Sequence, residues 1–154
     1  MRYLNGGRPT PREEVENAIL PRILAFYERY DEFGYWAAEE KSTGEFVGWF
    51  ELHPTDERPP DELALGYRLR RSAWGKGYAT EGSRALVDKA FRELGAERVF
   101  ADTMTVNVAS RRVMEKAGLK YVRTFHLEWE EEIEGTAEGD VEYALTRAEW
   151  EAAG

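Results

Sequence analysis

Alternation of apolar and polar side chains predicts the strands of this chain. In residues 62–70 the apolar positions fall on every second residue, which is the period of a half-buried strand: Leu63, Leu65, Tyr67 and Leu69. Other short apolar stretches are bounded by glycine, proline or acidic turns. We therefore expect strands at residues 35–39, 46–53, 62–70, 98–103, 119–129 and 141–145. Residues 41–44 would form the hairpin turn between the first two.

Apolar residues at helical spacing predict the helices. In residues 75–94 they form a single stripe, made of Ala79, Leu86, Val87, Ala90, Phe91 and Leu94. A shorter helix is expected at residues 107–116. Near the N-terminus, Thr10 and the proline after it begin another helical pattern. Pro21 interrupts that pattern, so we expect a kink or two helices there.

The order of these elements predicts a mixed α/β (α+β) fold. A helix, three strands, a helix, a strand, a helix and two strands follow one another, so hairpin and crossover connections both occur. The sheet should therefore be mixed, with mostly antiparallel neighbours. A chain of 154 residues fits one domain, and the sequence has no repeat or linker. We therefore treat residues 1–154 as a single domain.

Composition excludes several classes of site. The chain has no cysteine, which excludes disulfides, thiolate nucleophiles and cysteine-ligated metals, and its two histidines are His53 and His126. We expect no metal. The net charge of −9 makes nucleic acid and anionic membranes poor partners. Without a long apolar run or a signal-like segment at residues 1–10, a soluble cytoplasmic protein is the expectation.

The charge is unevenly distributed along the chain. Residues 68–116 contain eleven basic and six acidic side chains, whereas the rest of the chain is strongly acidic. A positive middle segment could hold a small polyanion, although solvated helix faces explain the same composition. A motif inside this segment is needed to decide between the two.

Such a motif follows the third predicted strand and opens the helix at residues 75–94. It reads Trp-Gly-Lys-Gly-Tyr-Ala-Thr over residues 74–80. Unpaired N–H groups at a new helix N-terminus, with the helix dipole, favour a phosphate or pyrophosphate, and Lys76 adds positive charge. The motif lacks the spacing of a nucleoside-triphosphate loop and the third glycine of a dinucleotide fingerprint. A plain tight strand-to-helix turn remains the structural alternative.

A second motif, Asn-Val-Ala-Ser over residues 107–110, opens the next predicted helix. Alone, Asn107 and Ser110 fit an N-cap and a first-turn residue. Together the two motifs resemble the GNAT acyltransferase superfamily, in particular the branch that acetylates the N-terminal amines of ribosomal proteins. The segments that carry the resemblance are residues 67–69, 74–81, 107–110 and 116–119, with a further likeness at 146–150.

The resemblance implies the GNAT fold, with strands that splay at the cofactor site, and acetyl-CoA as co-substrate. In this family the pyrophosphate rests on backbone amides of the glycine turn, which here comprises Trp74, Gly75, Lys76, Gly77, Tyr78, Ala79 and Thr80. The pantetheine arm pairs with the strand before the turn, here at Leu69, Arg70 and Arg71. Asn107 would bond the pantetheine or a bound water. The gap that admits the thioester would lie between this strand and residues 98–103.

The implied reaction is direct transfer of the acetyl group from sulfur to a primary amine, such as a protein N-terminus or a small cationic amine. It needs a base for the amine and a proton donor for the thiolate. Glu62 is the candidate base, with His53 as a competitor, and Ser110 is the candidate donor. Met114 stands where many relatives have a tyrosine, so a tyrosine donates only if Tyr121 or another reaches the site.

The resemblance is incomplete at the N-terminus. The strand and helix with which the family usually begins are not found in this chain, so we expect an exposed sheet edge that favours a homodimer. A non-catalytic acyl-CoA-binding module therefore remains an alternative function, and an unrelated mixed domain is a third. The acidic surface outside residues 68–116 is compatible with a cationic acceptor.

Overall fold

The computed structural model describes residues 34–126 and 136–153. Six strands form one sheet in the order β1-β2-β3-β4-β6-β5. They are β1 (Gly34–Glu39), β2 (Phe46–His53), β3 (Glu62–Leu69), β4 (Arg98–Met104), β5 (Lys120–Phe125) and β6 (Asp140–Thr146). Within this sheet β3 and β4 are parallel, and the other neighbours are antiparallel. The predicted mixed, mostly antiparallel sheet is confirmed, whereas the helical pattern from Thr10 to beyond Pro21 lies outside the described residues.

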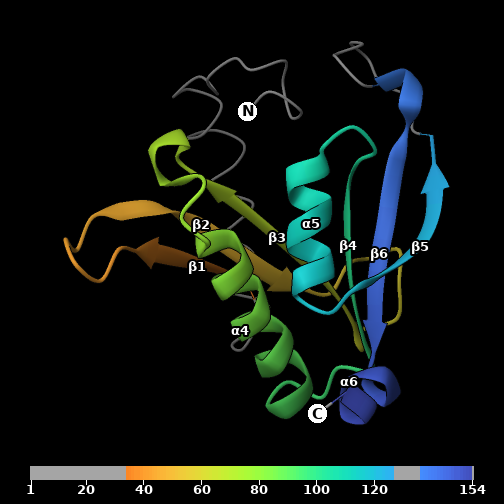
Figure 1. Cartoon of the computed structure of the whole chain (residues 1–154). Helices are drawn as coiled ribbons and strands as arrows, with labels where there is room; N and C mark the ends of the chain where they lie inside the picture. Colours follow the sequence, from red (N-terminus) through yellow and green to blue (C-terminus); the bar gives the residue numbers. More distant parts are fainter. Residues whose placement is uncertain (1–33, 127–135, 154) are drawn as a thin grey trace.

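Two helices, α4 (Tyr78–Arg92) and α5 (Val108–Lys116), lie on the same face of the sheet (Figure 1). α4 begins three residues later than predicted, because Gly75 and Gly77 have left-handed φ angles of 76° and 81°. The short 3₁₀ helix η2 (Arg71–Ala73) and this glycine turn connect β3 to α4. Because β3 ends at Leu69, both Arg70 and Arg71 lie outside the strand on which the resemblance placed the pantetheine arm.

The hydrophobic core lies between these helices and the sheet. The middle of the predicted stripe on α4 is buried, as are the facing side chains of the strands: Leu86, Val87, Ala90, Phe91, Leu52, Leu63, Val99 and Tyr143. Gly82 brings α4 close to β2, because a Cβ atom there would lie 2.2 Å from the ring of Phe50. The packing fixes the position of the N-terminal end of α4 relative to the strands.

A C-terminal helix, α6 (Arg147–Ala153), corrects the predicted order, which ended in a strand. Thr146 and Glu149 start this helix with a reciprocal capping box: each side chain accepts the backbone N–H of the other residue, at 3.2 and 3.1 Å. Trp150 then stacks on Phe91 of α4, with ring centroids 5.3 Å apart. The helix thus anchors the end of the chain to the core.

The parallel contact between β3 and β4 covers only three residue pairs. Glu62, Leu63 and Ala64 are opposite Arg98, Val99 and Phe100, and the pairing stops there although both strands continue. Figure 1 shows the two strands spreading apart beyond this point, with α5 beside the gap. The predicted splay is therefore present, and it separates the sheet into a β1-β2-β3 part and a β4-β6-β5 part.

Candidate functional site

The turn between β3 and α4 presents unpaired backbone N–H groups. Gly77 is the N-cap of α4, and no side chain caps this helix end. The Gly77 carbonyl accepts a bond from the N–H of Glu81 at 3.0 Å, and within the described residues no backbone carbonyl accepts from the N–H groups of residues 78–80. A Cβ atom at Gly75 or Gly77 would meet nothing within 4 Å. The turn therefore has the donors and the free space that a pyrophosphate needs.

Part of the positive charge at this turn is compensated by the β1–β2 hairpin. Lys76 Nζ lies 3.5 Å from Glu40 Oε2, and the Tyr78 hydroxyl donates to the same oxygen at 2.5 Å. The hydrogen bond from Tyr78 is the main reason that the pKa of Glu40 lies below its ordinary value. The Lys76 side chain is still half exposed, so its ammonium can also turn to an anion at the turn.

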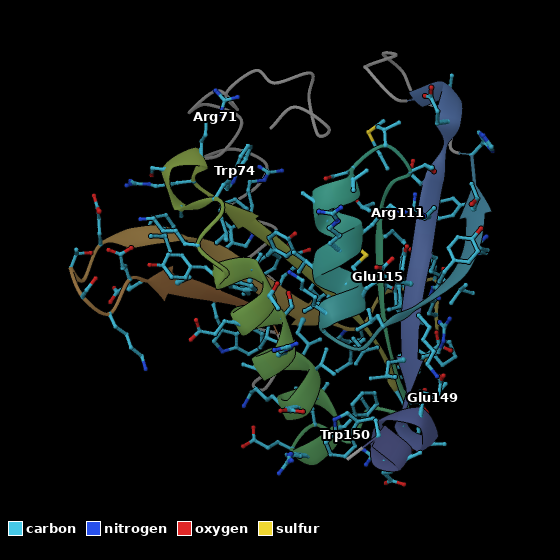
Figure 2. All side chains as sticks on the ribbon, viewed as in Figure 1. Arg71, Trp74, Arg111, Glu115, Glu149 and Trp150 are labelled. Carbon is cyan, nitrogen blue, oxygen red and sulfur yellow. The ribbon has the colours of Figure 1, made fainter. Side chains whose placement is uncertain are left out.

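Trp74 and Arg71 occupy the connection just before the turn, as Figure 2 shows. The guanidinium of Arg71 lies over the indole ring at 5.7 Å. The indole N–H donates to the Leu69 carbonyl at 3.0 Å, which ties the connection to the end of β3. Trp74 is 51% exposed, so this large apolar surface is open beside the glycine turn.

The edge of β3 that faces the gap carries free backbone groups. Arg70 donates its N–H to Val47 of the preceding strand at 2.7 Å. Because the two sides alternate along an antiparallel strand, the backbone groups of Tyr67 and Leu69 point away from β2, toward the gap. The Leu69 carbonyl already binds Trp74. Among the residues that the resemblance assigns to the pantetheine, Leu69 therefore directs its N–H toward the gap. Tyr67, which was not assigned, directs both its N–H and its carbonyl there.

The start of α5 places Ser110 against Tyr67. Asn107 Oδ1 accepts the N–H of Ser110 at 3.3 Å, so Asn107 caps the helix, as the structural alternative predicts. The Tyr67 hydroxyl lies 3.0 Å from Ser110 Oγ, and burial raises the pKa of Tyr67. Tyr67 is thus a tyrosine that reaches the candidate donor. Tyr121 is exposed on β5 and bonds Thr124.

Glu62, the candidate base, lies where β3 and β4 are still paired. Its carboxylate is 3.3 Å from a nitrogen of Arg98 and 3.5 Å from a nitrogen of Arg58. Five positions separate it from Tyr67, or about 17 Å of strand, and its side chain points to the opposite face. The structure does not bring Glu62 and Ser110 together, and the role of Glu62 as a base stays a prediction.

His53, the competing base, lies one strand farther from the gap. It is opposite Ala64 at the end of β2, and its Nδ1 is 3.0 Å from the Pro54 carbonyl. Its Nε2 is 3.7 Å from Glu51, and its ring stacks on Tyr35 at 5.6 Å. The geometry leaves its catalytic role a prediction as well.

Asp102, which the sequence analysis does not single out, lies on β4 beside the gap. It is two residues past Phe100, the last residue paired with β3, and so is level with Gly66 across the opening. Although the Asp102 side chain is open to solvent on one side, partial desolvation by the neighbouring strands, followed by repulsion from Glu142, raises its pKa to about 6. In the sequence Asp102 stands out as a carboxylate within a mainly apolar strand. Its place at the gap, however, follows from the register between β3 and β4.

The same face of the sheet contains a buried ionic cluster around Glu142. Glu142 is 2% exposed, and its carboxylate contacts Arg58, Arg98 at 3.0 Å and Arg123 at 3.3 Å. Burial alone favours the neutral carboxyl, but hydrogen bonds from Arg58 and Arg98 outweigh it and hold the pKa of Glu142 below its ordinary value. The cluster joins the β2–β3 loop to β4, β5 and β6.

The described residues lack two further features, a cluster of metal ligands and a membrane-spanning helix. Residues 34–126 and 136–153 contain no group of three or more histidine, aspartate or glutamate side chains arranged to hold a metal ion. Over the same ranges no helix combines the length and the apolar character that a membrane crossing requires.

Comparison with known proteins identifies the family. The family described as "Acetyltransferase (GNAT) domain" matches residues 1–120. The FsC-acetyl coenzyme A-N(2)-transacetylase of Aspergillus fumigatus is 44% identical over 124 residues, which are 77% of this chain and 52% of the relative. A probable N-acetyltransferase of Bacillus subtilis is 35% identical over 102 residues, 63% of this chain and 55% of its own length. This chain thus spans about half the length of these curated relatives.

A solved structure supports the same conclusion. The crystal structure of an aminoglycoside acetyltransferase in complex with coenzyme A and kanamycin is 25% identical, with a TM-score of 0.68, and the match covers 95% of this chain and 82% of the other. The splayed strands, the uncapped helix end and these similarities agree. This chain belongs to the GNAT acetyltransferase family.

Proposed function

We propose that this protein transfers the acetyl group of acetyl-CoA directly to a primary amine. The observation that carries the proposal is the gap between β3 and β4, which opens beside the free N–H groups of α4. Acetyl-CoA has a negatively charged pyrophosphate and a thin amide-bearing arm. The N-terminus of α4 is suited to bind the pyrophosphate, and the free edge of β3 is suited to pair with the amides of the arm.

The residues at the gap supply both proton transfers. Asp102 lies on the face of β4 opposite α5, whereas Ser110 and Tyr67 lie on the α5 side. An acceptor that enters beside Asp102 first loses its ammonium proton to solvent, and the neutral amine then attacks the thioester carbonyl while Asp102 accepts the second proton. A pKa of about 6 suits a base that works near neutral pH. Ser110 donates a proton to the departing sulfur from the other side, and positioning in the gap supplies much of the rate.

The acceptor we propose is a small cationic amine, with a protein N-terminus as the other acceptor to be tested. The names of two similar proteins support a small molecule, since one is an FsC N(2)-transacetylase and the other was solved with kanamycin. The net charge of −9 favours a cation over an acidic acceptor. Support for the branch that acetylates ribosomal proteins is limited to a fold likeness at 17% identity.

Two measurements on the full chain test this proposal. Isothermal titration with acetyl-CoA checks binding, and release of free thiol with a panel of amines checks transfer. The panel contains a polyamine, an aminoglycoside, an amino-terminal peptide and the same peptide with a blocked N-terminus as the matched control. Mass spectrometry of each reaction then locates the added acetyl group.

The results separate the alternatives. Binding with thiol release that depends on a free amine supports the proposal. Binding without release across the whole panel would instead support an acyl-CoA-binding module. A folded protein that gives no heat at high micromolar acetyl-CoA contradicts the site itself.

A further inference from the structure

The hydroxyl pair formed by Tyr67 and Ser110 lies beside the gap between β3 and β4. Ser110 is in the first turn of α5, where the Asn107 side chain already satisfies its N–H. The Ser110 hydroxyl is not used by the cap, and it lies 3.0 Å from the phenol of Tyr67. The contact joins β3 and α5 across the site where the strands have parted.

The ring of Tyr67 is held in place by its surroundings. It packs against Phe50 with ring centroids 5.8 Å apart, and Phe50 is in turn pressed against Gly82 of α4. Burial raises the pKa of Tyr67, so its phenol stays protonated at neutral pH. The hydroxyl is therefore a fixed and permanently available hydrogen-bond donor.

A pair of hydroxyl groups has two protons and uses one of them internally. If Tyr67 donates to Ser110 Oγ, the proton of Ser110 is free to point into the gap. Donation from Tyr67 also makes Ser110 a stronger donor, because successive hydrogen bonds polarise one another. In the reverse orientation the Ser110 proton would point to the Tyr67 oxygen, and it could not be donated into the gap.

We propose that Tyr67 is a positioning residue that orients and polarises Ser110 as the proton donor to the coenzyme sulfur. The inference rests on the proposed acetyl transfer. The amine nitrogen bonds the carbonyl carbon, the carbon–sulfur bond breaks, and its electron pair leaves with sulfur. Ser110 gives its proton to that sulfur and is reprotonated by Tyr67. The proton released by the amine passes through Asp102 to solvent, and Tyr67 regains one from solvent.

The test compares Tyr67→Phe, Ser110→Ala and the double variant in steady-state kinetics. Tyr121→Phe is the matched control, because it removes an exposed tyrosine hydroxyl that, among the described residues, bonds Thr124 of the same strand and lies away from the gap. We expect Tyr67→Phe to lower kcat by about 10- to 100-fold, with KM and coenzyme affinity changed less than twofold. The double variant should lose no more than Ser110→Ala alone, since the two act as one unit.

A second readout separates a proton role from a structural one. Replacing Tyr67 by 3-fluorotyrosine keeps the hydroxyl but makes it more acidic. We expect this variant to recover most of the kcat lost in Tyr67→Phe and to shift the alkaline limb of the pH profile to lower pH. Thermal unfolding of each variant, with coenzyme A titration, confirms that the fold and the site persist.

The failures are distinguishable. Wild-type protein that transfers acetyl while Tyr67→Phe keeps full kcat would overturn the inference and leave the proposed function intact. If the loss of kcat in the double variant equals the product of the two single losses, the inference also fails and the proposed function remains. A wild-type protein that binds acetyl-CoA but acetylates no amine would overturn both.

Discussion

Gly77 combines two properties that make the anion site: a left-handed φ of 81° and open space where a side chain would be. Asparagine and aspartate tolerate this backbone conformation about equally well, and they differ in charge. The position therefore allows a clean test of the electrostatic role of the turn.

Gly77→Asp should weaken coenzyme A binding by roughly tenfold more than Gly77→Asn. The physical reason is that a carboxylate would occupy the place of the pyrophosphate, whereas the amide has the same shape without the charge. Titration calorimetry at one ionic strength measures the difference, and urea unfolding checks that both variants are folded. Equal affinities in the two variants would show that no anion binds here.

Asp102 provides a second test at this scale. Its pKa of about 6 predicts that kcat/KM falls as the pH drops below 6, because the base becomes protonated. Asp102→Asn should lower kcat by about 100-fold and remove this acid limb. Because a partly desolvated charge is lost, the variant should be at least as stable as wild type at pH 7.

Glu62→Gln is the comparison variant, since Glu62 is the base that the sequence favours. The acid limb should persist in Glu62→Gln. If that limb disappears in Glu62→Gln and persists in Asp102→Asn, the base is Glu62 and the geometric argument for Asp102 fails.

At the scale of elements, local patterns predicted most boundaries. The turns on either side of the apolar stretch in β2 predicted both of its ends, and β1, β3, β4 and β6 differ by one residue at one or both ends. The helix α6 was missed because its apolar side is reduced to Trp150 and its neighbouring alanines, although Thr146 and Glu149 carry a capping box. Short helices of this kind depend on the cap and on tertiary packing more than on a stripe.

The candidate site was predictable only in part, for the same reason. The glycine turn and the cap at Asn107 are local in sequence, and both were found. The places of Asp102, Tyr67 and Glu62 depend on which strands pair and where the pairing stops, and no local pattern contains that register. The alternation in residues 62–70 does not reveal that Arg58 and Arg98 surround the Glu62 carboxylate.

The cap of α5 gives a prediction at this scale. Asn107→Ala should cost about 1 kcal/mol of unfolding free energy, whereas Asn107→Ser should keep most of the stability because serine also caps. Urea denaturation measures both. If Asn107 bonds the pantetheine as well, both variants should lose coenzyme affinity. An alanine variant as stable as wild type would contradict the capping role.

At the scale of the whole molecule, Glu142 connects segments that are far apart in the sequence. It lies on β6 and binds arginines from the β2–β3 loop, β4 and β5. Removing one member of such a buried cluster leaves the opposite charges unpaired. Glu142→Gln should therefore reduce the unfolding free energy by about 3–5 kcal/mol, whereas the exposed Glu138→Gln should change it little.

The pH dependence of stability follows from the same carboxylate. The folded protein holds the pKa of Glu142 below 4.5, so its contribution is complete above pH 4.5 and is lost as the pH falls through the folded value. Asp102 acts in the opposite direction, since its raised pKa costs stability as the pH rises toward 6. Urea midpoints from pH 3 to 7 should show Glu142→Gln with a weaker acid loss. An unchanged pH profile would contradict the role of this cluster.

The three residue pairs between β3 and β4 have a mechanical consequence. The two halves of the sheet are hydrogen-bonded to each other only through these pairs in the described residues. An extended coenzyme arm would pair with β3 where β4 has separated from it. Because a ligand that binds only the folded state adds to its unfolding free energy, the melting temperature should rise with the concentration of acetyl-CoA.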